Sequence, residues 1–198
     1  MTKSKKETLE ALPVKIALFD LDDTLADYQG QVLHDLKRIA SPDEPPILNV
    51  FSTKPYLSAR RKIITSQLGW WVNLPKFQFG WDVLEVVREL GYSVSILTRG
   101  PKSNHTAWSE KVQWCNKNLA KLITGVTVCH DKSMVYGAVL VDDFPAYIKS
   151  WLDHRPRGLV IMPAHEYNAD FIHPQVVRYD GTNILEVRTR LSERFERV

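Results

Sequence analysis

The sequence has little cysteine and no long apolar run, and both absences narrow the kinds of protein it can be. Two cysteines among 198 residues, Cys115 and Cys129, provide neither a disulfide framework nor a metal-binding set, so we expect two buried free thiols. No stretch of about 18 apolar residues occurs, which excludes a membrane-spanning helix. Residues 1–9 are polar and lysine-rich and lack the apolar stretch of a secretory signal, so we expect a cytoplasmic protein.

Excess charge of one sign is also small. The formal net charge is +3, and part of it comes from lysines within the first fifteen residues. A nucleic-acid-binding surface needs a denser cluster of basic residues on one face, so we expect neither a nucleic acid nor a membrane as partner. A thinly spread positive balance instead suits a small anionic substrate. With 44% hydrophobic residues the chain can bury the core of one domain.

Short apolar runs alternate with amphipathic segments along most of the chain. The runs that predict strands are 14–20, 92–97, 126–128, 138–141 and 159–162. The segments that predict helices are 29–40, 53–69, 81–90, 106–122, 146–153 and 183–198. Apolar strands that alternate with helices predict an α/β fold with a doubly wound, mostly parallel, Rossmann-like sheet.

One stretch interrupts this alternation. Residues 30–79 carry helical patterns only, and they follow the first strand directly. We interpret them as a small helical cap inserted into a core domain made of residues 14–29 and 80–198, with residues 1–13 as a flexible basic tail. The alternative is an ordinary long crossover, but the length and aromatic content of the stretch favour a cap.

Three predicted strands end in polar residues that can take part in chemistry. Asp20 follows the first strand, Thr98 the second, and Asp142 the fourth. In an open parallel sheet, ligands bind at the carboxyl ends of the strands, so we expect these three side chains to meet in one crevice.

The segment from Asp20 to Leu25 reads Asp-Leu-Asp-Asp-Thr-Leu. Two carboxylates one residue apart, just past a buried strand, allow one to attack an electrophile while the other transfers protons. A cation between Asp20, Asp22 and the Asp142–Asp143 pair would offset the repulsion among these acids, and ligands that are all oxygen favour Mg²⁺. The alternative is a loop of solvated aspartates, but the position after an apolar strand and before Thr-Leu favours the catalytic interpretation.

Three further residues have the chemistry to hold a phosphate group. Thr98 offers a hydroxyl and the backbone N–H groups of the turn that follows, and Arg99 offers a bidentate guanidinium. Lys132 precedes the fourth predicted strand, so its ammonium can reach the same crevice. Taken singly, Arg99 and Lys132 are also ordinary surface residues.

In this order the motifs resemble those of the haloacid dehalogenase-like (HAD) phosphatases. The matching segments are Phe19–Leu25, Leu97-Thr98, Lys132 and Val141–Asp143. The resemblance implies that Asp20 forms an aspartyl-phosphate and that Asp22 protonates the leaving oxygen and later activates water. It also implies that Thr98 and Lys132 hold phosphate. Mg²⁺ would be bound by Asp20, the Asp22 carbonyl and Asp142, with Asp143 as a supporting or substitute ligand.

Within that superfamily the chain is similar to the 5′(3′)-deoxyribonucleotidases of the cytosolic and mitochondrial type. The similar segments are Leu25–Tyr28, Trp70–Leu74, Trp81–Leu84, Lys111–Trp114 and His130–Val135. In that family, aromatic residues at the positions of Tyr28, Trp70 and Trp71 line a nucleobase pocket, and aromatic faces stack well on bases. The resemblance therefore implies a nucleoside monophosphate substrate. The alternative for Trp70 and Trp71 is a place in the cap core, and the two rings can differ in this respect.

The chain departs from this family at three places where phosphate and sugar would be held. Asp23 stands where a glycine is usual, His130 stands where an arginine is usual, and Arg99-Gly100 replaces a small residue and proline. Because of these departures, two other enzymatic functions remain as alternatives. One is a nucleic-acid 3′-phosphatase, which the basic run Arg60-Arg61-Lys62 would serve if it faced the crevice. The other is a phosphatase of another small metabolite.

A non-catalytic binding module is the hypothesis from a different class, and the presence of both Asp20 and Asp22 disfavours it. A small cap in this superfamily often works beside a partner subunit, which leaves room for a homodimer. Five other histidines show no metal-ligand spacing, so we expect them at the surface or in loops. They are His34, His105, His154, His165 and His173.

Overall fold

The computed structural model of the protein describes residues 15–197. The predicted basic tail, the start of the first predicted strand at Val14 and the last residue lie outside the described residues. The helices are α1 (Tyr28–Arg38), α2 (Pro55–Thr65), α3 (Gln78–Glu89), α4 (His105–Leu119), α5 (Pro145–Asp153) and α6 (Ile184–Glu196), with short 3₁₀ helices η1 (Trp71–Asn73), η2 (Lys132–Met134) and η3 (Glu166–Asn168). The strands are β1 (Ile16–Phe19), β2 (Ser93–Arg99), β3 (Gly125–Cys129), β4 (Val139–Val141), β5 (Leu159–Pro163) and β6 (Val176–Tyr179).

The strands form one sheet in the order β3-β2-β1-β4-β5-β6, and every pairing between neighbours is parallel. The predicted doubly wound α/β fold is therefore confirmed. Strand β1 lies in the middle, where Phe19 pairs with Ile96 of β2 on one side and with Val141 of β4 on the other. This register brings the carboxyl ends of the three strands to the same edge of the sheet.

Side chains that alternate along the central strands bury both faces of the sheet. On one face, Ala17 and Phe19 pack in the same cluster as residues of α3, α4 and α6. On the other face, Leu18 packs with Ile148 and Trp151 of α5. This alternation is the reason that the strands have apolar residues at successive positions.

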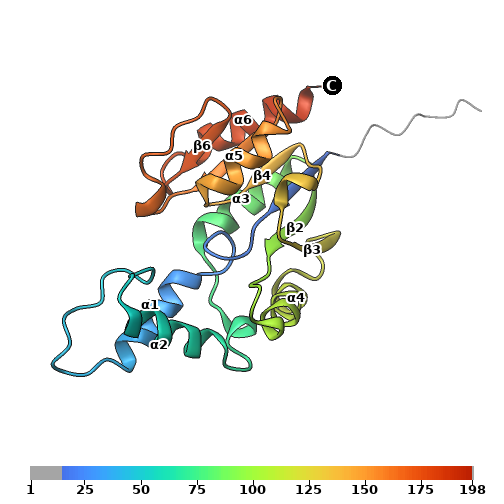
Figure 1. Ribbon diagram of the computed structural model, residues 1–198. Coiled ribbons are helices and arrows are strands. Elements are labelled where there is room, and N and C mark those ends of the chain that lie inside the picture. Colours follow the sequence, from blue (N-terminus) through green and yellow to red (C-terminus); the bar gives the residue numbers. More distant parts are fainter. Residues whose placement is uncertain (1–14, 198) are drawn as a thin grey trace, which may run out of the picture.

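The segment between β1 and α3 has an apolar cluster of its own. Its buried members are Val32, Leu36, Ile47, Val50, Leu57 and Ile64. Figure 1 shows α1 and α2 side by side, set apart from the sheet. The two connections to the core run together, because the Asp27 N–H donates to the Pro75 carbonyl (2.8 Å) and the Phe77 N–H donates to the Leu25 carbonyl (2.9 Å). The cap boundaries at 30 and 79 stay a prediction.

The predicted elements agree with the observed ones except at their ends and at one strand. The helix predicted over 53–69 ends at Thr65, and the helix predicted from 81 begins at Gln78. Strand β6 was not predicted, because its four residues offer only two buried side chains, Val177 and Tyr179, at alternate positions. Both cysteines are free, as predicted, but only Cys115 is buried and Cys129 is half-buried.

Within residues 15–197, no helix combines the length and the apolar character that crossing a membrane requires. The cytoplasmic location stays a prediction.

Candidate active site

A tight turn after β1 places the first two aspartates. The Asp20 N–H donates to the Val141 carbonyl (2.8 Å), which extends the ladder between β1 and β4 by one residue and sets Asp20 beside Asp142. The N–H groups of Leu25 and Ala26 then donate to the Leu21 carbonyl (2.9 and 2.8 Å), so the chain folds back on itself. A Cβ atom at Gly80 would lie 1.7 Å from the Thr24 carbonyl oxygen, so α3 approaches this turn as closely as only glycine allows.

Asp23 occupies a position of the turn that usually suits glycine. Its φ is 55°, in the left-handed region that aspartate tolerates better than most residues. Its carboxylate accepts a hydrogen bond from the Gln29 N–H (2.8 Å) at the start of α1. Burial raises the pKa of Asp23 to about 7, although this hydrogen bond lowers it in part. The structure thus accounts for the departure from glycine at this position.

Lys132 lies between Asp20, the predicted nucleophile, and Asp142, a predicted metal ligand. Its ammonium is 2.7 Å from an Asp20 oxygen and donates to Asp142 Oδ2 at 2.6 Å. Asp131 caps η2 by accepting from the Ser133 N–H (2.9 Å), which holds Lys132 in place. Burial alone would lower the pKa of Lys132, but the two carboxylates outweigh it and raise the pKa above its usual value. Lys132 is therefore a fixed positive charge.

Three buried carboxylates can hold a metal ion. Asp20, Asp142 and Asp143 each offer an oxygen, and these oxygens lie within 4.8 Å of one another. Burial raises the pKa of Asp142 to about 6 and that of Asp143 well above its usual value, and neighbouring carboxylates add to both effects. Lys132 alone does not balance three acids in so small a buried volume, so the donor set fits a divalent cation such as Mg²⁺. The Asp22 side chain is not part of this group.

Hydroxyl donors orient Asp143. The Thr24 hydroxyl donates to one carboxylate oxygen at 3.0 Å, and the Tyr167 hydroxyl donates to the other. The Asn168 side-chain amide donates to the Asp143 carbonyl (2.9 Å). Tyr167 and Asn168 belong to η3, which follows β5, so a loop from the far half of the sheet supports the metal candidate.

Asp22 and Thr98 meet at a lysine of α4. The Lys111 ammonium donates to Asp22 Oδ2 (2.6 Å), to the Arg99 carbonyl (2.6 Å) and toward the Thr98 hydroxyl oxygen (3.3 Å). Burial raises the pKa of Asp22, and the charge of Lys111 lowers it in part. The structure thus brings Asp20, Asp22, Thr98, Lys132, Asp142 and Asp143 together at one edge of the sheet, while their roles stay a prediction.

Arg99 turns away from Thr98 toward α5. Its guanidinium donates to the Tyr147 hydroxyl and lies 5.3 Å from the centre of the Tyr147 ring. The same ring is 5.0 Å from the Lys132 ammonium. The opposite directions of Thr98 and Arg99 follow from the alternation of side chains along β2.

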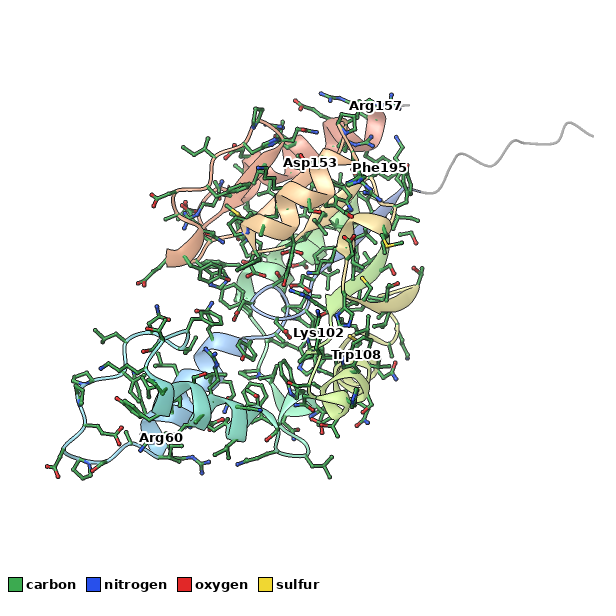
Figure 2. The ribbon with its side chains drawn as sticks, in the orientation of Figure 1. Arg60, Lys102, Trp108, Asp153, Arg157 and Phe195 are labelled. Atoms are coloured by element: carbon green, nitrogen blue, oxygen red, sulfur yellow. The ribbon has the colours of Figure 1, made fainter. Side chains whose placement is uncertain are left out.

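A cavity of about 840 Å³ opens above these residues. Asp20, Asp22, Asp23 and Asp143 line its polar end. Its aromatic walls come from Tyr28, Phe51, Trp71, Phe144, Tyr147 and Tyr167, while Arg99 at the end of β2 and Lys102 in the loop that follows also line it. Figure 2 labels Lys102 in that loop, on the side of the core that faces the cap. The cavity thus joins a carboxylate end to an aromatic end.

The two adjacent tryptophans have different surroundings. Trp71 lines the cavity and stacks on Tyr28, with ring centres 5.3 Å apart and planes at 23°. Trp70 is absent from the residues that line this cavity, and its indole N–H donates to the Asp35 carboxylate (2.8 Å) on α1. Of the three predicted base-pocket residues, the structure brings Tyr28 and Trp71 to the cavity and leaves Trp70 in the cap.

Three residues near the site were missed by sequence reasoning. Lys111 lies in a segment that resembles the nucleotidases, but no motif of the sequence indicates a role for it. Tyr167 lies in a loop where no element was predicted. His165, expected in a loop, is in one, but its ring nitrogen is 2.7 Å from the Asp23 carbonyl oxygen and its ring stacks between Phe77 and Tyr167. No spacing in the sequence indicates contacts over such distances along the chain.

The basic run on α2 does not face the cavity. Arg60 forms a two-pronged ion pair with Glu44 (2.6 and 2.7 Å), and Arg61 donates to the Val50 carbonyl (2.6 Å). Neither these arginines nor Lys62 are among the residues that line the cavity. Figure 2 labels Arg60 on the part of the cap away from the sheet.

Comparison with known proteins identifies the fold. No protein-family model and no curated protein matches the sequence. A "predicted phosphatase" from Clostridium acetobutylicum is 13% identical with a TM-score of 0.57, over 91% of this chain and 99% of that one. A protein from Burkholderia xenovorans classed as a haloacid dehalogenase-like hydrolase is 12% identical with a TM-score of 0.54, over 92% and 99% of the two chains.

A third similar structure is a magnesium-bound protein from Bacillus subtilis classed as a HAD hydrolase. It is 14% identical with a TM-score of 0.50, over 83% of this chain and 94% of that one. At these identities the likeness concerns the fold. The chain therefore has the fold of the haloacid dehalogenase-like hydrolases and phosphatases.

Proposed function

We propose that the protein is a Mg²⁺-dependent phosphomonoesterase that removes phosphate from nucleoside monophosphates, deoxynucleotides in particular. One observation carries the proposal. Asp20 and Asp143 line one end of a cavity whose walls are aromatic, and the buried Asp142 carboxylate and Lys132 ammonium lie directly against them. The carboxylate end suits a phosphate and its metal ion, and the aromatic walls suit a base.

The reaction we propose has two steps. Asp20 forms a bond to phosphorus while the bond from phosphorus to the ester oxygen breaks, and Asp22 donates a proton to that oxygen. Asp22 then takes a proton from water, the water oxygen attacks phosphorus, and the bond to Asp20 breaks to release inorganic phosphate. The raised pKa of Asp22 supports a role that begins with a protonated carboxyl group.

Two buried residues next to the polar end bind and orient the phosphate. Thr98 donates its hydroxyl, and Lys132 supplies a fixed charge that also holds Asp20. Mg²⁺ bound by Asp20, Asp142, Asp143 and the Asp22 carbonyl would neutralise charge on the phosphate oxygens. Such transfer depends mostly on position and charge neutralisation.

The aromatic end supports a base-bearing substrate. Stacking on aromatic rings such as Tyr28 and Trp71 is worth about 1–3 kcal/mol per base. A cavity of about 840 Å³ lies within the usual range for small-molecule sites, roughly 300–1,000 Å³. A sugar phosphate would use the polar end equally well but would leave these rings without a partner.

The nucleic-acid 3′-phosphatase is the second candidate, and the placement of the basic run disfavours it. Arg60 already pairs with Glu44, and the run lies outside the cavity lining. A binding module without turnover would be favoured only if the complete set of acids proved inactive.

Phosphate release from a substrate panel tests the proposal. The panel contains deoxy- and ribonucleoside monophosphates with 5′- or 3′-phosphate, sugar phosphates and a 3′-phosphorylated oligonucleotide, each with Mg²⁺ and with a chelator. We expect Mg²⁺-dependent release that is fastest from deoxynucleotides and absent in Asp20→Asn. Release from the oligonucleotide or the sugar phosphates alone would keep the chemistry and reject the nucleotidase. No release from any substrate would favour a binding module.

A further inference from the structure

Lys111 is a charged residue in an unusual place. It projects from the middle of α4, its side chain is only 1% exposed, and it lies beside two residues of the proposed reaction. A buried lysine is costly unless hydrogen bonds and an opposite charge compensate it. Here its partners are the Asp22 carboxylate, the Thr98 hydroxyl and the Arg99 carbonyl. A residue placed at this cost next to the site needs an explanation beyond packing.

The direction of these hydrogen bonds is fixed by chemistry, because an ammonium group can only donate. The Thr98 oxygen must therefore accept from Lys111, which leaves the hydroxyl hydrogen of Thr98 free to donate to an anion. Lys111 in this way leaves the buried Thr98 hydroxyl as a hydrogen-bond donor beside the polar end of the cavity.

The same argument distinguishes the two oxygens of Asp22. Oδ2 accepts from Lys111 at 2.6 Å, while Oδ1 is buried and has no hydrogen-bond partner within residues 15–197. Asp22 also lines the cavity. One oxygen is thus held by the protein, and the other is left for the leaving oxygen of a substrate.

Lys111 is also tied to the cap through its neighbour. The Glu110 carboxylate accepts from the N–H groups of Gly69 (2.7 Å) and Trp71 (3.0 Å), where the cap segment meets the core. The Trp71 ring centre lies 4.9 Å from the Lys111 ammonium. Consecutive residues of α4 therefore hold the aromatic wall and the polar end of the same cavity.

We propose that Lys111 is a positioning residue for phosphoryl transfer: it holds one oxygen of Asp22 so that the other meets the leaving group, and it orients the Thr98 hydroxyl toward phosphate. This inference rests on the proposed function and extends it to a residue of α4. It requires that loss of Lys111 lowers kcat most for substrates whose leaving oxygen needs a proton.

The test compares Lys111→Met with Lys117→Met, the same substitution at an exposed residue of the same helix that contacts Asn73 at 3.2 Å. Each variant hydrolyses a deoxynucleoside monophosphate, a poor leaving group, and para-nitrophenyl phosphate, a good one. For Lys111→Met we expect kcat to fall about 100-fold on the nucleotide and about 10-fold on the nitrophenyl ester, with KM nearly unchanged. Lys117→Met should match the wild type on both substrates.

An equal loss on both substrates, or a loss confined to KM, would overturn the positioning role and leave the proposed function intact. Absence of turnover by the wild type would overturn both, since the inference needs the reaction. These outcomes separate the two proposals.

Removal of Lys111 can impair folding because it leaves the half-buried Asp22 carboxylate without its partner charge, so a second comparison uses Asp22→Asn. In that background the unpaired charge is gone, and Lys111→Met is added to it. We expect the addition to lower the residual turnover of both substrates by the same factor, because the proton donor is already absent. A loss that still depends on the leaving group in this background would contradict the proposal.

Discussion

The two ends of the cavity are built in different ways. At the carboxyl edge of the sheet, the backbone pairing of β1 with β2 and β4 determines the positions of Asp20, Thr98 and Asp142 relative to one another. On the cap side, contacts between side chains decide which ring faces the cavity, as Trp71 does while Trp70 turns to Asp35. Under the proposed function, we therefore expect substitutions at the first end to affect the reaction and substitutions at the second end to affect the choice of substrate.

The largest effect is expected at the sheet edge. Lys132→Met leaves Asp20 and Asp142 buried without their shared cation, which should abolish phosphate release and lower the free energy of unfolding by about 3–5 kcal/mol. Urea unfolding and phosphate release measure the two effects. Lys149→Met, an exposed lysine on α5, is the control and should change neither. Unchanged stability in Lys132→Met would mean that the three charges do not form one unit.

The next largest effect is expected at the aromatic wall. Trp71→Leu removes the ring that stacks on Tyr28, so KM for a deoxynucleotide should rise by a factor that corresponds to about 1–3 kcal/mol. KM for para-nitrophenyl phosphate should change less, because that substrate lacks a base. Trp70→Leu is the matched control and should leave both KM values unchanged. A larger rise for Trp70→Leu than for Trp71→Leu would reverse the assignment of the two rings.

This difference between the two ends also explains which site residues can be predicted from the sequence. Parallel strands put their carboxyl ends at one edge, so a polar residue after an apolar run is informative by itself. Asp20, Thr98 and Asp142 were therefore predictable, and so was the α/β fold. Strand β6 was not, since a four-residue edge strand leaves almost no periodic signal.

Residues that reach the site from helices and loops cannot be predicted from strand ends in this way. Lys111 enters from α4, and Tyr167 from the loop after β5, where it donates to Asp143. Their positions depend on how α4 and that loop pack, which no local spacing records. The orientations of Trp70 and Trp71 are equally hidden from the sequence. The two residues are adjacent and have the same side chain, so only the local backbone conformation determines which ring faces the cavity.

A third prediction concerns the turn that joins the two ends. The pKa of Asp23 is raised by burial from 3.8 to about 7, so the folded state binds its proton more tightly than the unfolded chain does. Its contribution to stability is fully present below the unfolded value and is lost as the pH rises through 7. Asp23→Asn keeps the acceptor for Gln29 and suits a φ of 55°, and it stays neutral at every pH.

In metal-free buffer, Asp23→Asn should therefore gain stability over the wild type as the pH rises, on the order of 2 kcal/mol between pH 5 and pH 8. Thermal unfolding across this range measures it. Asp27→Asn is the control for a carboxylate of the same segment, since Asp27 caps α1 through the Gly30 N–H. A gain that does not vary with pH would show that relief of backbone strain, not loss of a buried charge, is responsible.

The smallest effect is expected on the outer side of the cap. Arg60 is engaged by Glu44 and Arg61 donates to the Val50 carbonyl, and neither residue lines the cavity. A triple variant, Arg60→Gln with Arg61→Gln and Lys62→Gln, should leave KM within about twofold for both a deoxynucleotide and a 3′-phosphorylated oligonucleotide. Steady-state kinetics at low ionic strength, where surface charges act most strongly, gives the most demanding test. A rise in KM for the oligonucleotide alone would show that α2 binds the end of a nucleic acid. The cap would then favour long substrates over single nucleotides and would not recognise a base.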